Sequence, residues 1–229
     1  MRIRERHQRC RLDLAQRRGH TYLTLENALI RVGFVLTKGA DLVEFRHKPS
    51  DVDAMWHSPH RLHPPGAQID SVASSGGAFL DYYPGGWQEI LPAGGGPCVY
   101  MNAQIGLHGE ACLLPWEAEV LEDAPERVTV RLSAEMRRTP FVVGEQVLEL
   151  MWGQHAAFGA PFIEAGCEID LPPAVVTTMT EPYGRGVRFA LNQEADWPAL
   201  QTVNGETARA DLVLGKEART HDTYTIAPS

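Results

Sequence analysis

Strict alternation of apolar and polar residues between Glu126 and Arg138 constrains this chain more than any other feature. Polar or charged residues separate apolar positions that share one side of an extended chain: Val128, Val130, Leu132, Ala134 and Met136. Successive side chains of a β-strand point to opposite faces, so a period of two predicts a strand with one buried face. We expect this strand to lie in a sheet that covers an apolar core.

Similar patterns recur along most of the chain, and no long segment has helical periodicity. Strands are predicted for Thr21–Glu26, Leu29–Val35, Leu42–His47, Phe141–Leu150, Phe162–Leu171, Asp211–Leu214 and Thr223–Ile226. Glycine (21 residues) and proline (16 residues) interrupt these segments, which is typical of many short strands joined by turns. Loops are predicted for His57–Gly66 and Tyr83–Pro97. The sequence therefore predicts an all-β sandwich or barrel, in a single domain over residues 1–229.

Charge is unevenly distributed along the chain. Residues 1–18 hold seven arginines against Glu5 and Asp13, so this segment carries +5 and the rest of the chain carries −13 of the net −8. We interpret residues 1–20 as a basic N-terminal arm exposed to solvent. An acidic body repels phosphate backbones, so no nucleic-acid partner is predicted.

Membrane and secretory segments are not predicted. The chain has no run of 18 apolar residues, and no apolar stretch follows the basic N-terminus. The four cysteines, Cys10, Cys98, Cys112 and Cys167, are scattered and have no CxxC spacing. Scattered cysteines in a chain of this length indicate reduced thiols, and so a cytoplasmic protein.

Three short segments could carry chemistry. The first is Gly85–Glu89, where two glycines precede Trp87, Gln88 and Glu89. An indole face suits the C–H side of a pyranose ring, and the amide and carboxylate suit its hydroxyls. The alternative, with Trp87 in the core and Glu89 on the surface, stays open. Gln88, as the amide of this group, is a candidate sugar ligand.

The other two segments each place a histidine beside a glycine. His108 lies in Gly106–Glu110, which Leu114–Glu117 follows, and His155 lies in Trp152–Gly159. A histidine titrates near neutrality and can act as a general acid. A single histidine is more often structural, so the order and spacing of the three segments matter more than each segment does.

Taken together, these segments resemble the aldose 1-epimerase (galactose mutarotase-like) family, over roughly residues 20–170. Gly-Gly-Trp-Gln-Glu, His-Gly before Leu-Pro-Trp-Glu, and Gly-Gln-His before an aromatic residue occur in this order in that family, as do Leu25–Asn27 and Lys38–Asp41 in its first strands. The resemblance implies a large antiparallel β-sandwich of the galactose mutarotase-like supersandwich type. It also implies a small-molecule sugar as the partner, and neither a cofactor nor a metal.

The chemistry that the resemblance implies is exchange of sugar anomers. A carboxylate removes the proton of the C1 hydroxyl, a histidine protonates the ring oxygen, and the opened ring recloses on the other face. His155 matches the proton-donating histidine and His108 the histidine that contacts the sugar. Trp87, Gln88 and Glu89 match walls of the same cleft, and Trp152 precedes the His155 motif. We expect His108, His155, Trp87 and Glu89 to line one concave pocket.

Several positions depart from the family pattern. Its Asn-Arg pair, upstream of the first histidine, is replaced by Val99–Ala103, in which Asn102 is the nearest polar residue. Glu110 follows His108-Gly109 where an aromatic residue is usual. No glutamate occupies a context that matches the family's C-terminal base. These departures place the chain in a divergent branch.

Strand accounting predicts that the chain lacks segments. Phe141–Leu150 is long enough to extend about 33 Å, and no turn residue lies between Gln146 and Trp152 to bring the chain back toward His155. We expect residues to be missing near Leu148–Trp152 and again beyond Ser229. A Cα step across that junction should then exceed about 3.8 Å.

Alternatives to an active epimerase remain. The first is a non-catalytic carbohydrate-binding domain of the same fold that lacks the catalytic base. A phosphosugar epimerase would need cations such as Arg46 and Arg61 to hold the phosphate. His57, His60 and His63 recur at every third position, but the neighbouring prolines forbid a helix that would align them, and we predict no metal site. Lys38–Asp41 is interpreted as a hairpin connection.

Overall fold

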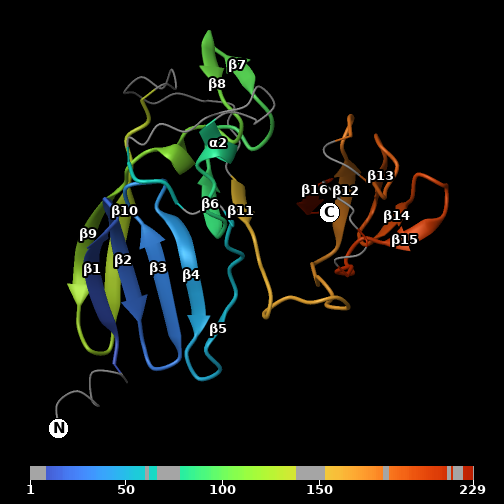
Figure 1. Ribbon diagram of the computed structural model, residues 1–229. Helices are drawn as coiled ribbons and strands as arrows, with labels where there is room; N and C mark the ends of the chain where they lie inside the picture. Colours follow the sequence, from blue (N-terminus) through green and yellow to red (C-terminus); the bar gives the residue numbers. More distant parts are fainter. Residues whose placement is uncertain are drawn as a thin grey trace. The chain divides into compact units, whose positions relative to one another are not determined.

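The computed structural model describes residues 9–59, 62–65, 78–137, 153–182, 186–215, 218 and 224–228. The chain forms two compact units, Met1–Phe162 and Ile163–Ser229. Strands dominate both units (Figure 1), and the described part of the chain includes the short helix α2 (Ala78–Asp81) and the 3-10 turn η1 (Ala111–Leu113). The prediction of an all-β fold is confirmed. The prediction of a single domain over residues 1–229 depends on whether the two units associate, so it stays a prediction.

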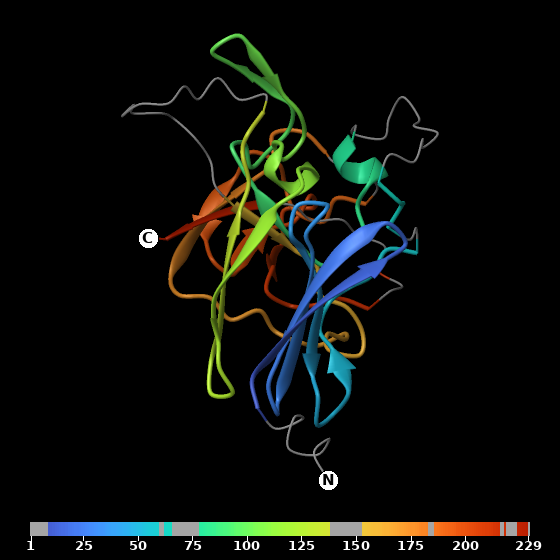
Figure 2. The same ribbon diagram turned by 90° about the vertical axis from the view of Figure 1, so that its left-hand side faces the viewer.

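A seven-stranded antiparallel sheet forms most of the first unit (Figures 1 and 2). Its order is β1-β2-β3-β4-β6-β11, and β5 pairs with β4. The strands are β1 (Arg11–Arg17), β2 (His20–Glu26), β3 (Ile30–Val35), β4 (Asp41–His47), β5 (Val52–Asp53), β6 (Trp87–Ile90) and β11 (Gly153–Ala156). Strands β2, β3 and β4 lie within one or two residues of their predicted bounds. Consecutive hairpins join the first four strands, which explains why local alternation was enough to find them.

A hairpin of β9 (Glu117–Asp123) and β10 (Val128–Ser133) covers one face of this sheet. The core contains Leu23, Leu36 and Ala40, and the partly buried residues packed on it come from both layers: Leu12, Leu25, Phe34, Trp116, Ala118, Val130 and Leu132. Val130 and Leu132 are among the alternating apolar residues of the sequence. The two layers form the β-sandwich, and a second hairpin of β7 (Cys98–Tyr100) and β8 (Ala103–Ile105) extends beyond it (Figure 1).

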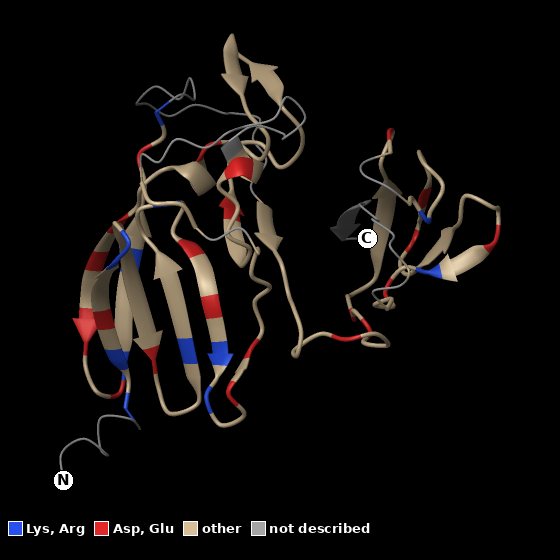
Figure 3. Ribbon diagram, in the orientation of Figure 1, with Lys and Arg blue, Asp and Glu red and all other residues tan. Residues whose placement is uncertain are grey.

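Acidic and basic residues lie on neighbouring strands of the large sheet (Figure 3), and several of their side chains form ion pairs. Arg11 and Lys48 both contact Glu26, while Arg31 and Arg46 both contact Glu44. Four cations thus share two glutamates of the sheet. Arg11–Arg17 of the expected N-terminal arm is strand β1, in which Leu12 packs on the core and Arg11 pairs with Glu26 of β2.

The turn between β1 and β2 shows why the sequence closes a tight hairpin there. Arg18 and Gly19 both have positive φ, 52° and 82°, which a two-residue turn of type I′ requires. Such a turn matches the right-handed twist of the two strands. His20 follows at once, is 3% exposed, and hydrogen-bonds Thr37 through Nδ1 and the carbonyl of His63 through Nε2.

The second unit holds two small sheets around its own core. Strands β13 (Glu194–Asp196), β12 (Ala174–Thr178) and β16 (Tyr224–Pro228) form one sheet, and β14 (Ala199–Gln201) pairs with β15 (Thr207–Arg209). Val176, Phe189, Leu200 and Ala210 form the core. Strand β16 matches the strand predicted at Thr223–Ile226.

Three predictions of secondary structure are wrong. Phe162–Leu171 consists of turns with a single bridge between Glu168 and Leu212, because Gly166 has φ 92° and interrupts the extended chain. Asp211–Leu214 holds only that same bridge. The loop predicted at Tyr83–Pro97 contains β6, whose place between β4 and β11 depends on partners distant in sequence. Phe141–Leu150, and the expected break at Leu148–Trp152, lie outside the described residues.

Two further predictions concern membrane-spanning segments and the state of the cysteines. In the described part of the chain, no helix has both the length and the apolar character needed to cross a bilayer. All four cysteines lie among the described residues and are free thiols, as predicted; Cys98 is exposed and Cys112 is buried.

Candidate functional site

His108 is held in an unusual backbone conformation by contacts on both sides. It has φ 60°, its N–H donates to the carbonyl of Gly95 (3.1 Å), and its Nδ1 lies 3.1 Å from the carbonyl oxygen of Gly94. The next residue, Gly109, has φ 77°, and a Cβ there would lie 2.2 Å from the carbonyl oxygen of Leu91. Glycine is therefore required at 109, and this close approach fixes the loop against the end of β6.

His155 reaches the same place from the edge strand of the large sheet. It lies in β11 and is paired directly with Gln88 of β6. The ring centroids of His108 and His155 are 5.4 Å apart, with the ring planes inclined by 53°. Two histidines separated by 47 residues of sequence thus meet at one site.

Aromatic residues from α2 and the segment after it surround the histidine pair. Phe79 is 2% exposed and contacts both imidazoles, at centroid distances of 4.6 Å to His108 and 5.4 Å to His155. Tyr83 stacks on Phe79, and its hydroxyl lies 3.3 Å from Nδ1 of His155. Trp56 stacks on the other side of Tyr83 at 5.9 Å. Aromatic faces beside polar groups are the usual lining of a small-molecule site.

A buried ion pair lies next to these rings. Nζ of Lys38 is 2.5 Å from Oδ2 of Asp41, and the Asp41 side chain is fully buried. Burial raises the pKa of Asp41 to about 6, although the ammonium of Lys38 and the amide of Gln88 both favour its charged form. The electrostatic influence of Asp41 reaches Tyr83, and that of Lys38 reaches His155.

Burial also sets the protonation of the rings and the phenol. It lowers the pKa of both histidines, and in His155 the nearby His108 lowers it further. Burial raises the pKa of Tyr83 to about 12, so its hydroxyl keeps its proton throughout the physiological range. A neutral imidazole and a protonated phenol can each donate or accept a hydrogen bond. The imidazoles of His108 and His155 and the phenol of Tyr83 can therefore each serve as a hydrogen-bond donor or acceptor at this site.

The structure places only some of the predicted site residues together. Gln88 is fully buried and lies across from His155 on the same side of the β6–β11 ladder. Trp87 and Glu89 are its neighbours along the strand, so they point to the opposite side. Glu89 accepts a hydrogen bond from Gln154 (3.0 Å), and Trp87 packs against Phe158. The expectation that Trp87 and Glu89 share a pocket with the histidines is therefore wrong.

The remaining predicted positions are also separate from the histidine pair. Asn102 is exposed in the turn between β7 and β8, with φ 66°. Arg46, the proposed phosphate ligand, pairs with Glu44, Asp51 and Asp53 on the charged sheet face. Trp152 and Arg61 lie outside the described residues. The Gly85-Gly86 pair serves packing, because a Cβ at either position would lie within 2.3 Å of a backbone oxygen.

Sequence reasoning missed five residues of the site: Lys38, Asp41, Trp56, Phe79 and Tyr83. One signal was present for the ion pair. Lys38 and Asp41 lie three residues apart between two apolar segments, where charged side chains are expected to be buried only as a pair. Phe79 and Tyr83 had no such signal, because an isolated aromatic residue outside a periodic segment fits a core as well as a site.

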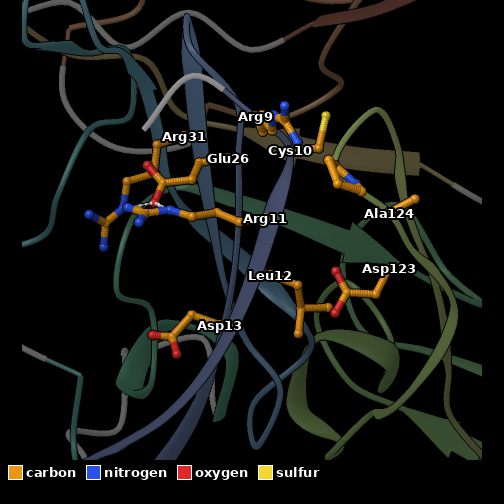
Figure 4. A pocket seen from close by; sticks show the side chains of 10 residues that line it. Arg9, Cys10, Arg11, Leu12, Asp13, Glu26, Arg31, Asp123 and Ala124 are labelled. Atoms are coloured by element: carbon orange, nitrogen blue, oxygen red, sulfur yellow. Dashed lines mark hydrogen bonds and ion pairs between the residues drawn. The ribbon is translucent and has the colours of Figure 1, made fainter. Parts of the chain in front are cut away.

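A separate hollow of about 750 Å³ lies where β1 and β3 begin and β2 ends (Figure 4). Arg11, Glu26 and Arg31 converge on one side of it. Three arginines and three acidic residues balance one another in its lining: Arg9, Arg11, Arg31, Asp13, Glu26 and Asp123. Its described lining contains no aromatic ring, so it does not offer the apolar face that a sugar ring prefers. We therefore take the histidine pair as the candidate site.

Comparisons with known proteins add little to this description. Neither the family models nor the curated proteins gave a match. Among solved structures, the chain is similar to one described as "Crystal Structure Analysis of HI1317", with 14% sequence identity and a TM-score of 0.38. The alignment covers 89% of this chain and 65% of that one, so this chain spans just under two thirds of that protein.

Proposed function

We propose that this protein is a carbohydrate-binding isomerase that interconverts the anomers of a free sugar by acid–base ring opening. The observation that carries the proposal is the meeting of His108 and His155, 5.4 Å apart and bordered by Phe79 and Tyr83. Anomer exchange needs no cofactor. It needs a proton donor at the ring oxygen, a proton acceptor at the C1 hydroxyl, and a surface that holds the ring.

Trp56, which is 38% exposed, supplies the surface in this proposal, and Tyr83 and the buried Phe79 support it within the same stack. Their rings form a continuous stack, with centroid distances of 5.4 Å and 5.9 Å. The C–H face of a pyranose packs well against an aromatic ring, and the hydroxyls on its rim then meet the imidazoles. Trp87 and Glu89 have no role here, because they lie on the other side of β6.

His155 is the proton donor at the ring oxygen. Its Nδ1 is bound to the Tyr83 hydroxyl, which fixes the plane of the imidazole. General acid catalysis of this kind contributes about 10²–10⁴-fold to a rate. The buried pair of Lys38 and Asp41 keeps the strand ends that carry the site in register, because neither charge can leave its partner without a large cost.

A nuclear magnetic resonance time course tests the proposal. A single anomer is dissolved freshly, and its conversion is followed with and without protein over pentoses, hexoses and sulfonated or phosphorylated sugars. We expect faster equilibration of at least one sugar. The His155→Asn variant should return the rate to that of solvent, while the exposed His57→Asn variant should match the unchanged protein, because His57 pairs with Asp53 away from the site.

Two results would count against the proposal. Acceleration of none of the sugars would contradict it, and binding without acceleration would instead support the non-catalytic carbohydrate-binding domain. Full activity in His155→Asn would exclude His155 as the acid.

A further inference from the structure

We infer that His108 is the general base of this site, and that the two imidazoles share a single catalytic proton. The inference rests on the proposed function and assigns the one role in ring opening that the proposal leaves open. It gives His108 a chemical task in place of the sugar-contacting role that the sequence resemblance implies.

The hydrogen bond to Gly94 fixes which nitrogen of His108 is free to act. A carbonyl oxygen only accepts, so the contact of 3.1 Å requires that Nδ1 carry the proton and donate it. In the neutral ring, Nε2 then holds the lone pair. A second bond, from the backbone N–H of His108 to Gly95, holds the residue itself in place. His108 is thus presented as a base with its accepting nitrogen directed away from the loop that anchors it.

In the reactive form that the inference requires, His155 is the partner that carries the proton. Its Nδ1 can donate to the Tyr83 oxygen, which leaves Nε2–H as the acidic site of an imidazolium. Two imidazolium rings with centroids 5.4 Å apart would repel each other, so the pair takes up a first proton much more readily than a second. The positive charge of Lys38 acts against protonation of His155 as well, while the phenol of Tyr83 is the neutral group that faces it.

Ring opening then proceeds with every proton accounted for. Nε2 of His108 takes the proton of the C1 hydroxyl, the electron pair of that O–H bond forms the carbonyl, and the bond between C1 and the ring oxygen breaks. The ring oxygen receives the Nε2 proton of His155. After rotation about C1–C2, the same oxygen attacks the other carbonyl face and returns its proton to His155, while His108 returns its proton to the C1 oxygen. No oxidant, reductant or metal is consumed.

Two variants of His108 separate this role from a structural one. Asparagine tolerates the left-handed conformation at φ 60°, and its amide N–H can still donate to Gly94, but it is not a base. Glycine also tolerates this φ and leaves room for added imidazole. We expect kcat to fall about 10²-fold or more in both variants, with KM little changed. Imidazole should restore activity to His108→Gly, in proportion to its neutral form, but not to His108→Asn.

The outcomes distinguish the inference from the proposed function. If the unchanged protein accelerates no sugar, both fail. If it is active and the variants lose affinity while keeping kcat, His108 only holds the sugar and the inference alone fails. A measurement that is independent of activity is the ¹⁵N shift of the His108 ring: we expect Nδ1 protonated and Nε2 bare at neutral pH. A proton on Nε2 of the neutral ring would overturn the inference.

Discussion

Gln88 and His155 lie directly opposite each other in the ladder between β6 and β11, and this pairing puts both side chains on the buried side of the sheet edge. The Nε2 amide of Gln88 donates to the carbonyl oxygen of Gly85 at 2.5 Å. Because the Gln88 amide is fully buried beside the partly buried imidazole of His155, the hydrogen bond that holds Gln88 affects both the stability of the fold and the geometry of the site.

Removal of the Gln88 amide should therefore destabilise the protein. Gln88→Leu keeps similar bulk but leaves the Gly85 carbonyl without its donor, so the free energy of unfolding should fall by about 1–3 kcal/mol. Urea denaturation measures this change. Glu89→Gln is the matched control on the next residue, and its effect should stay within about 0.5 kcal/mol, because its hydrogen bond to Gln154 is exposed. Equal effects in the two variants would contradict the assignment of faces.

Separation of the buried ion pair should cost more than its removal. Lys38→Met leaves the Asp41 carboxylate without its cation, and we expect a loss of about 3–5 kcal/mol in the free energy of unfolding. The double variant Lys38→Met with Asp41→Asn should recover part of that loss, because no buried charge remains. A double variant that is less stable than Lys38→Met would show that the pair contributes net stability by itself.

The pH dependence of stability should identify Asp41. Its folded pKa is raised from 3.8 to about 6, so between these values the folded protein binds more protons than the unfolded chain. The contribution of Asp41 to stability is therefore present at low pH and falls as pH rises from about 4 to 6. Asp41→Asn removes this contribution. As pH rises from about 4 to 6, the free energy of unfolding of the unchanged protein should therefore fall relative to that of Asp41→Asn. Thermal or urea denaturation at several pH values measures this difference.

Activity should depend on pH with a maximum on the acid side of ordinary histidine titration. The proposed mechanism needs His155 protonated and His108 neutral. Burial lowers the pKa of both rings below the usual value of about 6.5. Activity should fall as pH rises and the pair loses its one proton, and also as pH falls and the pair gains a second, which gives a bell with its optimum below about 6.5. A profile that only rises toward alkaline pH would contradict the one-proton mechanism.

Loss of the Tyr83 hydroxyl should affect His155 and little else. Tyr83→Phe keeps the stack on Phe79 and Trp56 but removes the oxygen beside Nδ1 of His155. An oxygen that accepts from the imidazolium favours the charged ring, so its removal should lower the pKa of His155. We expect the pH profile to move to lower pH and kcat to fall about tenfold. An unchanged profile would show that Tyr83 does not contact the acid during turnover.

Alternation of apolar residues was sufficient to predict the first strands and the all-β class. Thr21–Glu26, Leu29–Val35 and Leu42–His47 pair with their neighbours in sequence, so local pattern and final partner agree. Phe162–Leu171 failed for the opposite reason. Its residues are apolar enough for a strand, but a glycine at positive φ and distant contacts with Asp211 and Val213 decide their conformation.

The sequence by itself determined the class of fold, because the alternation of apolar residues follows the period of side chains along a strand. It also identified His108 and His155 as candidate site residues, through the order of the motifs that contain them. Only the tertiary structure decided which residues join them. The register of β6 against β11 sends Gln88 toward His155 and turns Trp87 and Glu89 away. Folding of α2 onto the loop of His108 adds Phe79, while the turn before β4 adds Lys38 and the first residue of β4 adds Asp41. Register and long-range packing depend on the sum of many distant contacts, which no single segment encodes.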